Sequence, residues 1–409
     1  MQPRSLLRRT IGAGLPREVA VLTVVAFFVA AGFGIVAPSI PVFARSFGVS
    51  RASAAAVVSV FALTRLACAL GVGRLVDRIG SRLVLGTGIA IVATSSALAG
   101  ISGDYPQLLL LRGLGGVGSA MFSVSASSLL IGVTSSDQRG RAMGTFSGGF
   151  LLGGIAGPVL GGFVTSWSLR APFFIYAGTL AVAGSVGFAL LPHHRHLDRA
   201  TTQSAPRPLR LLDALRLPAF RAAAAANLAD SWGAVGVRAA MVPLFVIEAL
   251  HQRAIWTGIG FSAFTIANIV TLVLAGRLAD RRGRRPLIIT GCLVSAGGAG
   301  MLSLPPSLVG FLLAMIVFGL GSGLLDVAPA AMLGDLAGGR GGSVVAGYQM
   351  AGDIGSLAGP FIAGLLADST GYALAFATTS GVLLAAAAIA VRAPETLEPA
   401  DPHRPKISR

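Results

Sequence analysis

The sequence GRLVDRIGSR at residues 73–82 recurs as GRLADRRGRR at residues 276–285. Gly73 and Gly276 are 203 positions apart, and so are Asp77 and Asp280. Both copies lie between long apolar segments, and their separation is about half of the 409-residue chain. Such a long-period repeat in an apolar chain is typical of membrane transporters built from two similar halves, with the site between them.

A second pair of similar segments has almost the same separation. GGIAGPVLGG occupies residues 153–162 and GSLAGPFIAG occupies residues 355–364, so that Gly157 and Gly359 are 202 positions apart. One offset shared by two unrelated motifs is improbable by coincidence. The two motifs therefore predict a duplication that spans most of the chain.

The composition predicts that the chain lies in a membrane. Hydrophobic residues make up 54% of it and charged residues 12%, whereas soluble domains carry about 25% charged residues. Twelve apolar segments follow one another, most of them longer than the roughly 20 residues that cross a hydrocarbon core. They are 19–44, 52–73, 83–101, 106–131, 142–166, 171–191, 218–247, 255–276, 286–304, 307–334, 343–367 and 371–391.

The longest polar interruption separates six of these segments from the other six. We therefore predict an N-terminal half at 1–191, a cytoplasmic linker at 192–217, a C-terminal half at 218–392 and a cytoplasmic tail at 393–409. The chain has no GxxxxGK[ST] phosphate-binding loop and no extramembrane module that could hydrolyse ATP. We expect neither an enzyme nor a bound cofactor.

The net charge of +16 is distributed unevenly. With both termini in the cytoplasm, most basic residues fall on the cytoplasmic face. The opposite face holds only Arg45, Arg51, Arg170 and Arg253. This asymmetry follows the positive-inside rule. It predicts a multi-pass protein of the cytoplasmic membrane with both termini inside, and it excludes a nucleic-acid-binding surface as the reason for the charge.

The cysteines and histidines do not indicate a disulfide or a metal site. Cys68 and Cys292 each lie inside an apolar segment, where a disulfide framework is not expected. The histidines of PHHRH at residues 192–196 stand beside a basic loop and are interpreted as solvated side chains. We expect no metal.

These features resemble the major facilitator superfamily over about residues 15–395. The repeated loop is similar to that family's signature GxLxDRxGRR, with Ser81 in place of the first closing basic residue. The resemblance implies an all-α membrane fold of two six-helix bundles related by a pseudo-two-fold axis. It also implies loops that close the cytoplasmic side, with Asp77 at the start of the segment 343–367. Their candidate residues are Gly73, Asp77, Arg78, Gly80, Arg82, Gly276, Asp280, Arg281, Gly283 and Arg284.

The segment 142–166 resembles the family's antiporter signature, Gx8Gx3GPx2G. Gly144, Gly153, Gly157, Pro158 and Gly161 fit its spacing. Glycines at these intervals make one helix face smooth, and Pro158 removes a backbone hydrogen bond, which lets the helix bend. Close packing in a glycine-rich membrane protein would give a similar pattern. The match at every position favours antiporter-type packing at the seam between the bundles.

Three acids lie inside apolar segments: Asp230, Asp326 and Asp353. Charged side chains are costly in a membrane and are usually functional, and burial favours the neutral form of a carboxyl group. All three are therefore candidates for proton coupling. Asp353 has a second interpretation, a gate-closing ion pair with a basic residue such as Arg65. Many relatives have an acid in the first or fourth segment, and this chain has none there.

The candidates for a substrate cavity are Arg112, Asn227, Trp232 and Arg238. RGLGGVGS at 112–119 is similar to the family's RxxQGxGA element, with Gly115 where glutamine is common. The resemblance implies that Arg112 contacts substrate or takes part in proton coupling. Its alternative is a structural charge bound to backbone carbonyls. If Arg238 pairs with Asp230 both are structural, whereas arginines that face the cavity would suit an anionic substrate.

We predict a monomeric drug/proton antiporter that exports a small amphiphilic molecule across the lipid bilayer in exchange for protons, as multidrug resistance proteins do. The alternative is a sugar or metabolite permease, either a symporter or a uniporter. The missing acid in the first segment favours the alternative, and the full glycine signature favours export.

Overall fold

The structure is a computed structural model that describes residues 15–134, 138–191, 211–337 and 342–397, and the regular structure in these ranges is entirely helical. Helices are the expected elements, because a backbone in lipid must satisfy its hydrogen bonds within the segment. Several begin at a capping side chain: Ser50 accepts from the Ser53 amide, Asp104 from the Gln107 amide at 2.8 Å and Ser307 from the Gly310 amide at 3.0 Å.

The N-terminal bundle consists of seven helices, one of them short. They are α2 (Arg17–Val36), α3 (Ile40–Arg45), α4 (Arg51–Ile79), α5 (Ser81–Gly100), α6 (Tyr105–Val133), α7 (Arg139–Thr165) and α8 (Ala171–Leu190). The predicted first segment is thus divided, because the chain turns between α2 and α3. Residues 192–210 of the predicted linker lie outside the described residues, and the rest of the linker contains the short helix α9 (Leu211–Ala214).

The C-terminal bundle repeats this arrangement with two local differences. Its elements are α10 (Pro218–Asp230), a π-helix (Ser231–Val237), α11 (Arg238–Glu248), α12 (Ile255–Arg282), α13 (Arg284–Met301), α14 (Leu308–Leu325), α15 (Ala328–Ala337), α16 (Gly342–Ser369) and α17 (Tyr372–Val391). The predicted segment 218–247 changes from α- to π-helix after Asp230, and the segment 307–334 is interrupted at Asp326 and Val327. Hydropathy does not reveal either change.

Eleven helical segments of the described chain are long and apolar enough to cross a membrane. The predicted segment 286–304 is not among them. It corresponds to α13, which has 18 residues and begins with Arg284 and Arg285, so its mean hydropathy is low. α13 nevertheless packs along α14 and α17 as one of the bundle helices. The protein is a multi-pass membrane protein, and the predicted all-helical, two-bundle fold is confirmed.

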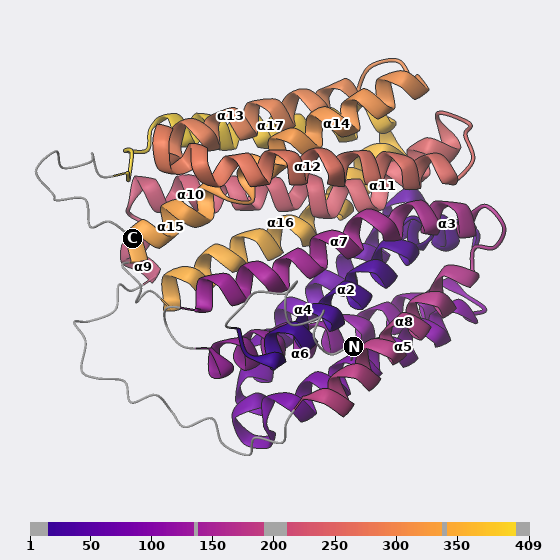
Figure 1. Ribbon diagram of the computed structural model, residues 1–409. Helices are drawn as coiled ribbons and strands as arrows, with labels where there is room; N and C mark the ends of the chain where they lie inside the picture. Colours follow the sequence, from indigo (N-terminus) through magenta and orange to yellow (C-terminus); the bar gives the residue numbers. More distant parts are fainter. Residues whose placement is uncertain (1–14, 135–137, 192–210, 338–341, 398–409) are drawn as a thin grey trace, which may run out of the picture.

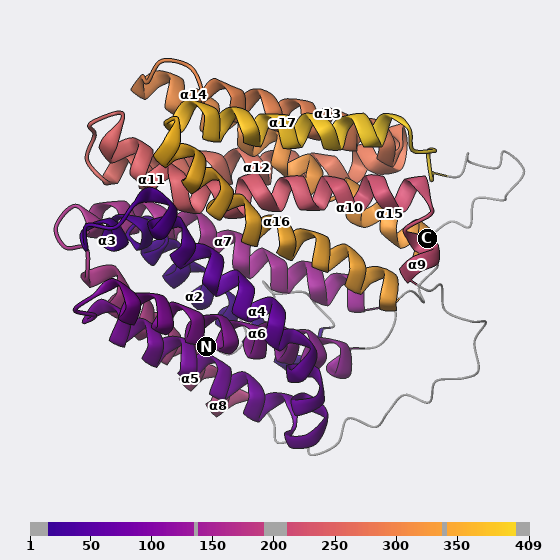
Figure 2. The ribbon, with the colours of Figure 1, turned by 180° about the vertical axis from the view of Figure 1, so that it is seen from behind.

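The bundles meet at one end of the molecule and diverge toward the other. We call the end where α2 and α10 begin and α17 finishes the terminal end, and the opposite end, which carries α3 and the finish of α11, the far end. α9 and α15 lie at the terminal end in both views, and the two bundles slant apart toward it (Figure 1, Figure 2).

The contacts between the bundles follow the sequence repeat. The Ser59 hydroxyl of α4 donates to the Leu357 carbonyl of α16 at 2.8 Å. The Ser262 hydroxyl of α12 donates to the Ile155 carbonyl of α7 at 3.0 Å. Ser262 is 203 positions after Ser59, and Leu357 is 202 after Ile155. A pseudo-two-fold relation between the halves is therefore present in individual hydrogen bonds.

The space around individual glycines shows where these contacts between the bundles end. At the far end, a Cβ added to Gly364 would lie 2.7 Å from the Ala52 Cα, and one added to Gly162 would lie 2.9 Å from the Ala254 carbonyl oxygen. Nearer the terminal end of α4 and α7, a Cβ at Gly73 or Gly148 would have no atom within 4 Å. The seams are thus closed at the far end, and a comparable contact is not described at these terminal-end positions.

Candidate functional site

Two carboxyl groups stand at the two helix interruptions of the C-terminal bundle. Asp230 is the last residue of α10, and its side chain is buried at 8% exposure. Its Oδ1 has no hydrogen-bond partner among the described residues. Asp326 follows the last residue of α14 and is exposed. Its Oδ2 accepts a hydrogen bond from the Asn268 amide nitrogen at 2.7 Å. Asp230 is therefore buried, with a side-chain hydrogen bond from Ser322 but with its Oδ1 unpaired in the described structure, whereas Asp326 is exposed.

Arg238 supplies the positive charge beside these acids. Its Nε donates to the Ala234 carbonyl at 2.7 Å, and its guanidinium lies over the rings of Phe261, at 4.7 Å, and Phe264, at 4.3 Å. Within the described residues, no ion pair of 4.0 Å or less joins it to Asp230 or Asp326, although both act on it electrostatically. Arg238 therefore places a positive charge near both acids without an ion pair to either in the described structure.

Glycines bring the helices of this site into contact. On α14, a Cβ at Gly319 would overlap the Phe264 carbonyl oxygen, and one at Gly323 would overlap the Asn268 carbonyl oxygen. Small residues let membrane helices approach this closely. α12 therefore lies against α14 at the register that brings Asn268 to Asp326. The π-helix that follows Asp230 is of a kind often found at functional sites.

The other two predicted cavity residues of this half lie within three positions of Asp230 in the sequence. The Asn227 amide donates to the Tyr348 carbonyl of α16 at 2.8 Å. Trp232 is buried, and its indole nitrogen has no partner in the described part of the chain. Asn227, Asp230 and Trp232 thus line one stretch of α10 and the π-helix. Their role in substrate contact stays a prediction.

Arg112 is buried in the other bundle, at 3% exposure. Its guanidinium lies 4.6 Å from the centre of the Phe61 ring, and its Nε has no hydrogen-bond partner among the described residues. The structure therefore places Arg112 on α6, away from Asp230, Asp326 and Arg238. It does not bring the two predicted arginines together.

Asp353 forms an ion pair with Arg65, as its second interpretation predicted. The Arg65 Nη2 lies 2.7 Å from the Asp353 Oδ1, and the pair joins α4 of one bundle to α16 of the other. Both residues stand near the middle of their helices. The ion pair is confirmed, and the role of Asp353 in proton coupling stays a prediction.

The two gate loops share one turn geometry. Gly80 and Gly283 separate the paired helices with φ of 88° and 97°, where glycine is favoured. Arg82 donates to the Phe188 carbonyl, and Arg285, 203 positions later, donates to the Val391 carbonyl at 2.5 Å. Each arginine thus joins its loop to the last helix of its own bundle.

Charged partners at these loops differ between the copies. In the second copy Arg284 lies 3.1 Å from Asp335. In the first copy Asp77 is exposed, and the described contacts do not include one between it and its expected partner, the start of the segment 343–367. The side chain of Asp280 also lies outside them. The gating roles of Asp77, Arg78, Asp280 and Arg281 stay predictions.

The glycines of the antiporter-like segment contact α2, within their own bundle. Cβ atoms at Gly153, Gly157 and Gly161 would overlap or crowd the carbonyl oxygens of Phe27, Ala31 and Ile35. The seam contact to α12 is made instead by Gly162 and by the Pro158 carbonyl against Gly258. An added Cβ at Gly144 would meet nothing within 4 Å. The smooth face therefore seals α7 onto α2, and the adjoining face forms the seam.

A group at the far end was not predicted as functional. Glu248 accepts from Arg45 at 2.9 Å, from Arg51 at 2.7 Å and from the Tyr372 hydroxyl at 2.8 Å. Asp368 accepts from the amides of Arg51 and Ala52 at 2.8 and 2.9 Å. Both acids belong to the C-terminal bundle and both arginines to the N-terminal one. The sequence did contain a signal for this group, since Arg45 and Arg51 are two of the four basic residues predicted on the face opposite the cytoplasm.

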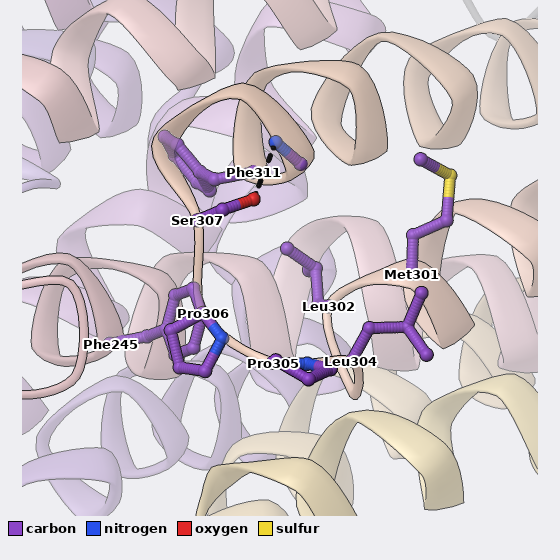
Figure 3. Close-up of a pocket in the computed structure, with 9 residues that line it drawn as sticks. Phe245, Met301, Leu302, Leu304, Pro305, Pro306, Ser307 and Phe311 are labelled. Carbon is purple, nitrogen blue, oxygen red and sulfur yellow. Dashed lines mark hydrogen bonds between the residues drawn. The ribbon is translucent and has the colours of Figure 1, made fainter.

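A small pocket of about 150 Å³ lies at the far end, between α13 and α14. Phe245, Leu302, Leu304 and two prolines line it, and Figure 3 shows the Ser307 hydroxyl turned to its own helix. The lining has no charged side chain. The pocket is therefore separate from the acids and offers no group for proton coupling.

Comparison with known proteins agrees with this geometry. A family model of the Major Facilitator Superfamily matches residues 22–251 and 223–409. Multidrug resistance protein 1 of Bacillus subtilis (strain 168) is 27% identical over 379 residues, 90% of this chain and 94% of that protein. The Synaptic vesicular amine transporter of Mus musculus is 26% identical over 309 residues, 74% of this chain and 58% of that protein.

A solved structure has the same fold. The crystal structure of a bacterial homologue of the human lysosomal transporter Spinster, in an inward-facing and occupied conformation, matches with a TM-score of 0.75. The match covers 96% of this chain and 97% of that chain at 16% sequence identity. This likeness concerns the fold alone.

Proposed function

Because the chain belongs to the major facilitator superfamily, whose members move small molecules across membranes, we propose that it exports a small amphiphilic molecule from the cytoplasm in exchange for protons. It is a multi-pass membrane transporter and not an enzyme. The direction of transport, the coupling to protons and the class of substrate are our proposal.

The observation that carries the proposal is the pair of acids in the C-terminal bundle. Asp230 is buried with an unsatisfied oxygen, while Asp326 is exposed, and Arg238 is near both without an ion pair to either among the described residues. A buried carboxylate without a bound cation is costly, so it favours a proton. The buried Asp230, the exposed Asp326 and the nearby Arg238 can together hold a proton or release it when a substrate binds.

The charge distribution supports an orientation. Basic residues are concentrated at the terminal end, so the positive-inside rule places that end in the cytoplasm. The far end, closed by Glu248 and Asp368, would then face outside. The structure would represent an inward-open state, in which Asp326 can meet a cytoplasmic substrate. Rocking of the two bundles about the seams would open the far end and close the terminal end.

The relatives support export over import. Multidrug resistance protein 1 of Bacillus subtilis and the vesicular amine transporter both match this chain along much of its length. The close packing of α7 on α2 by glycines is consistent with a transporter that excludes leakage while it changes state.

The proposal is tested by substrate-triggered proton movement in inside-out vesicles that carry a pre-formed pH gradient. Lipophilic cations, neutral drugs and organic anions are added in turn to the wild type, Asp230→Asn and Asp326→Asn. We expect partial collapse of the gradient with at least one class of compound, and loss of this response in both variants. Correctly folded wild-type protein that moves no protons with any compound would contradict antiport and favour the metabolite permease.

A further inference from the structure

Asn268 is a buried polar residue for which the sequence analysis predicts no role. It lies on α12, its side chain is 7% exposed, and its amide nitrogen donates to the Asp326 Oδ2 at 2.7 Å. In the described structure, the side chain of Asp326 is held by this hydrogen bond. A buried amide whose bond is directed at an exposed acid is suited to hold that acid in place.

The backbone fixes the position of this amide. A Cβ at Gly323 would overlap the Asn268 carbonyl oxygen and would lie 3.0 Å from the Leu272 nitrogen. α12 and α14 are therefore in backbone contact one turn before Asp326. The Asn268 side chain has only to cross the remaining gap, and its bond does not depend on a flexible loop.

The internal repeat shows that this position is used differently in the two halves. Asn268 is 203 positions after Arg65, just as Ser262 is 203 after Ser59. Arg65 reaches across the seam to Asp353 of the other bundle, whereas Asn268 reaches within its own bundle to Asp326. The equivalent position thus serves as a bond between the halves on α4 and as a partner of the acid on α12.

We propose that Asn268 is a positioning residue for proton coupling, which holds the Asp326 carboxyl group and stabilises its charged form. This inference rests on the proposed function of Asp326. An amide N–H directed at a carboxylate favours the charged over the neutral carboxyl group. Asn268 therefore sets the pH range over which Asp326 exchanges its proton.

Other groups also act on Asp326, and they are retained when Asn268 is changed. Asp230 of α10 and Arg238 of α11 are near it, and both acids act electrostatically on Tyr348 of α16. Cys292 of α13 is near Asp230. Removal of the amide alone should then shift the proton exchange without abolishing it.

The experiment compares Asn268→Leu, of similar volume but without a donor, with Asn268→Ser, which is too short to reach and keeps the position small. Thr271→Val is the matched control, because in the described part of the chain its hydroxyl bonds to carbonyls of its own helix, those of Ala267 and Asn268. The full-length proteins in nanodiscs are titrated while the infrared band of protonated carboxyl groups is recorded. The part of the band that is lost in Asp326→Asn is assigned to Asp326.

We expect the midpoint of this Asp326 band to rise by about one pH unit in both Asn268 variants, because a hydrogen bond to a charged group is lost. Thr271→Val should titrate as the wild type. The same upward shift should occur in the pH profile of substrate-triggered proton movement. Asn268→Leu should have no further effect in the Asp326→Asn background.

A midpoint that coincides with the wild type in both folded variants would overturn the proposal, as would an equal shift in Thr271→Val. The infrared titration needs no substrate, so it separates this inference from the proposed function. If the wild type moves no protons with any compound but the Asp326 band shifts as expected, proton-coupled export fails and the positioning by Asn268 stands.

Discussion

At the scale of single residues, Glu395 shows how one carboxylate stabilises a repeated loop. It accepts from the backbone amides of Arg284 and Arg285 at 2.9 and 3.1 Å, the first amides of α13. Gly283 precedes them with φ of 97°, and a Cβ there would overlap the Glu395 carboxylate. A carboxylate at a helix N-terminus satisfies orphan amides and complements the helix dipole.

The Glu395 bonds have a defined pH dependence. Partial burial raises the pKa of this carboxyl group, but four backbone hydrogen bonds, from Leu397, Arg284, Arg285 and Thr396, outweigh it and hold the pKa below its ordinary value. A lowered pKa in the folded state means that the stabilisation is present above the ordinary glutamate pKa. It is lost as the pH falls through the folded-state value.

We therefore expect Glu395→Gln to weaken the start of α13 by roughly 0.5–1 kcal/mol, the lower range for a cap because the site is exposed. Amides near residues 284–287 should exchange hydrogen roughly two to five times faster than in the wild type at pH 7. The ratio should approach one as the pH falls below the folded-state pKa. A ratio that does not change with pH would show that the carboxylate charge is not responsible.

At the scale of elements, α7 and α2 are held together by two matched series. Gly149, Gly153, Gly157 and Gly161 recur every four residues on α7, opposite the carbonyls of Thr23, Phe27, Ala31 and Ile35 on α2. Residues four apart lie on one helix face. The glycines therefore form a continuous groove into which the α2 backbone fits.

Two adjacent glycines give opposite predictions. An added Cβ at Gly149 would lie 2.5 Å from the Thr23 carbonyl oxygen, whereas one at Gly148 would have no atom within 4 Å. We expect Gly149→Ala to lower the unfolding temperature in detergent by several degrees, since overpacking costs about 1–3 kcal/mol. Gly148→Ala should be neutral or stabilising, because alanine favours a helix by up to about 1 kcal/mol. Equal effects of the two would contradict the packing.

The sequence predicted these elements better than their interactions. Hydropathy and the repeated loop were sufficient for two bundles, and the signature spacing identified the glycine face of α7. The same spacing did not reveal that this face contacts α2, because a smooth face suits any close neighbour. The π-helix after Asp230 and the interruption at Asp326 also lack a hydropathy signal. Asn268 was missed because a single amide in an apolar segment has no motif around it.

At the scale of the whole molecule, charges at the far end hold the two bundles together. Arg45 and Arg51 of one bundle share Glu248 of the other, and Arg51 also lies over the Tyr372 ring at 4.9 Å. These bonds join the halves only while the far end is closed. They therefore favour the state that the structure represents.

We expect Glu248→Gln to increase the population that is open at the far end by roughly tenfold, because it removes two partly buried ion pairs across the seam. Distances between spin labels on the far-end loops of the two bundles should show a larger open fraction. Arg170→Gln is the control, since Arg170 contacts Phe43 of its own bundle, at 5.8 Å. An unchanged distribution in Glu248→Gln, or an equal change in the control, would contradict this role.

The most direct test of proton-driven export is accumulation of substrate against its own gradient. Inside-out vesicles with an acidic interior and no membrane potential are given a lipophilic cation that responds in the proton assay. We predict that wild-type vesicles concentrate the compound above the external level and that collapse of the pH gradient releases it. Asp230→Asn and Asp326→Asn vesicles should only equilibrate. Equilibration without accumulation in wild-type vesicles, whatever the pH gradient, would contradict proton-driven export.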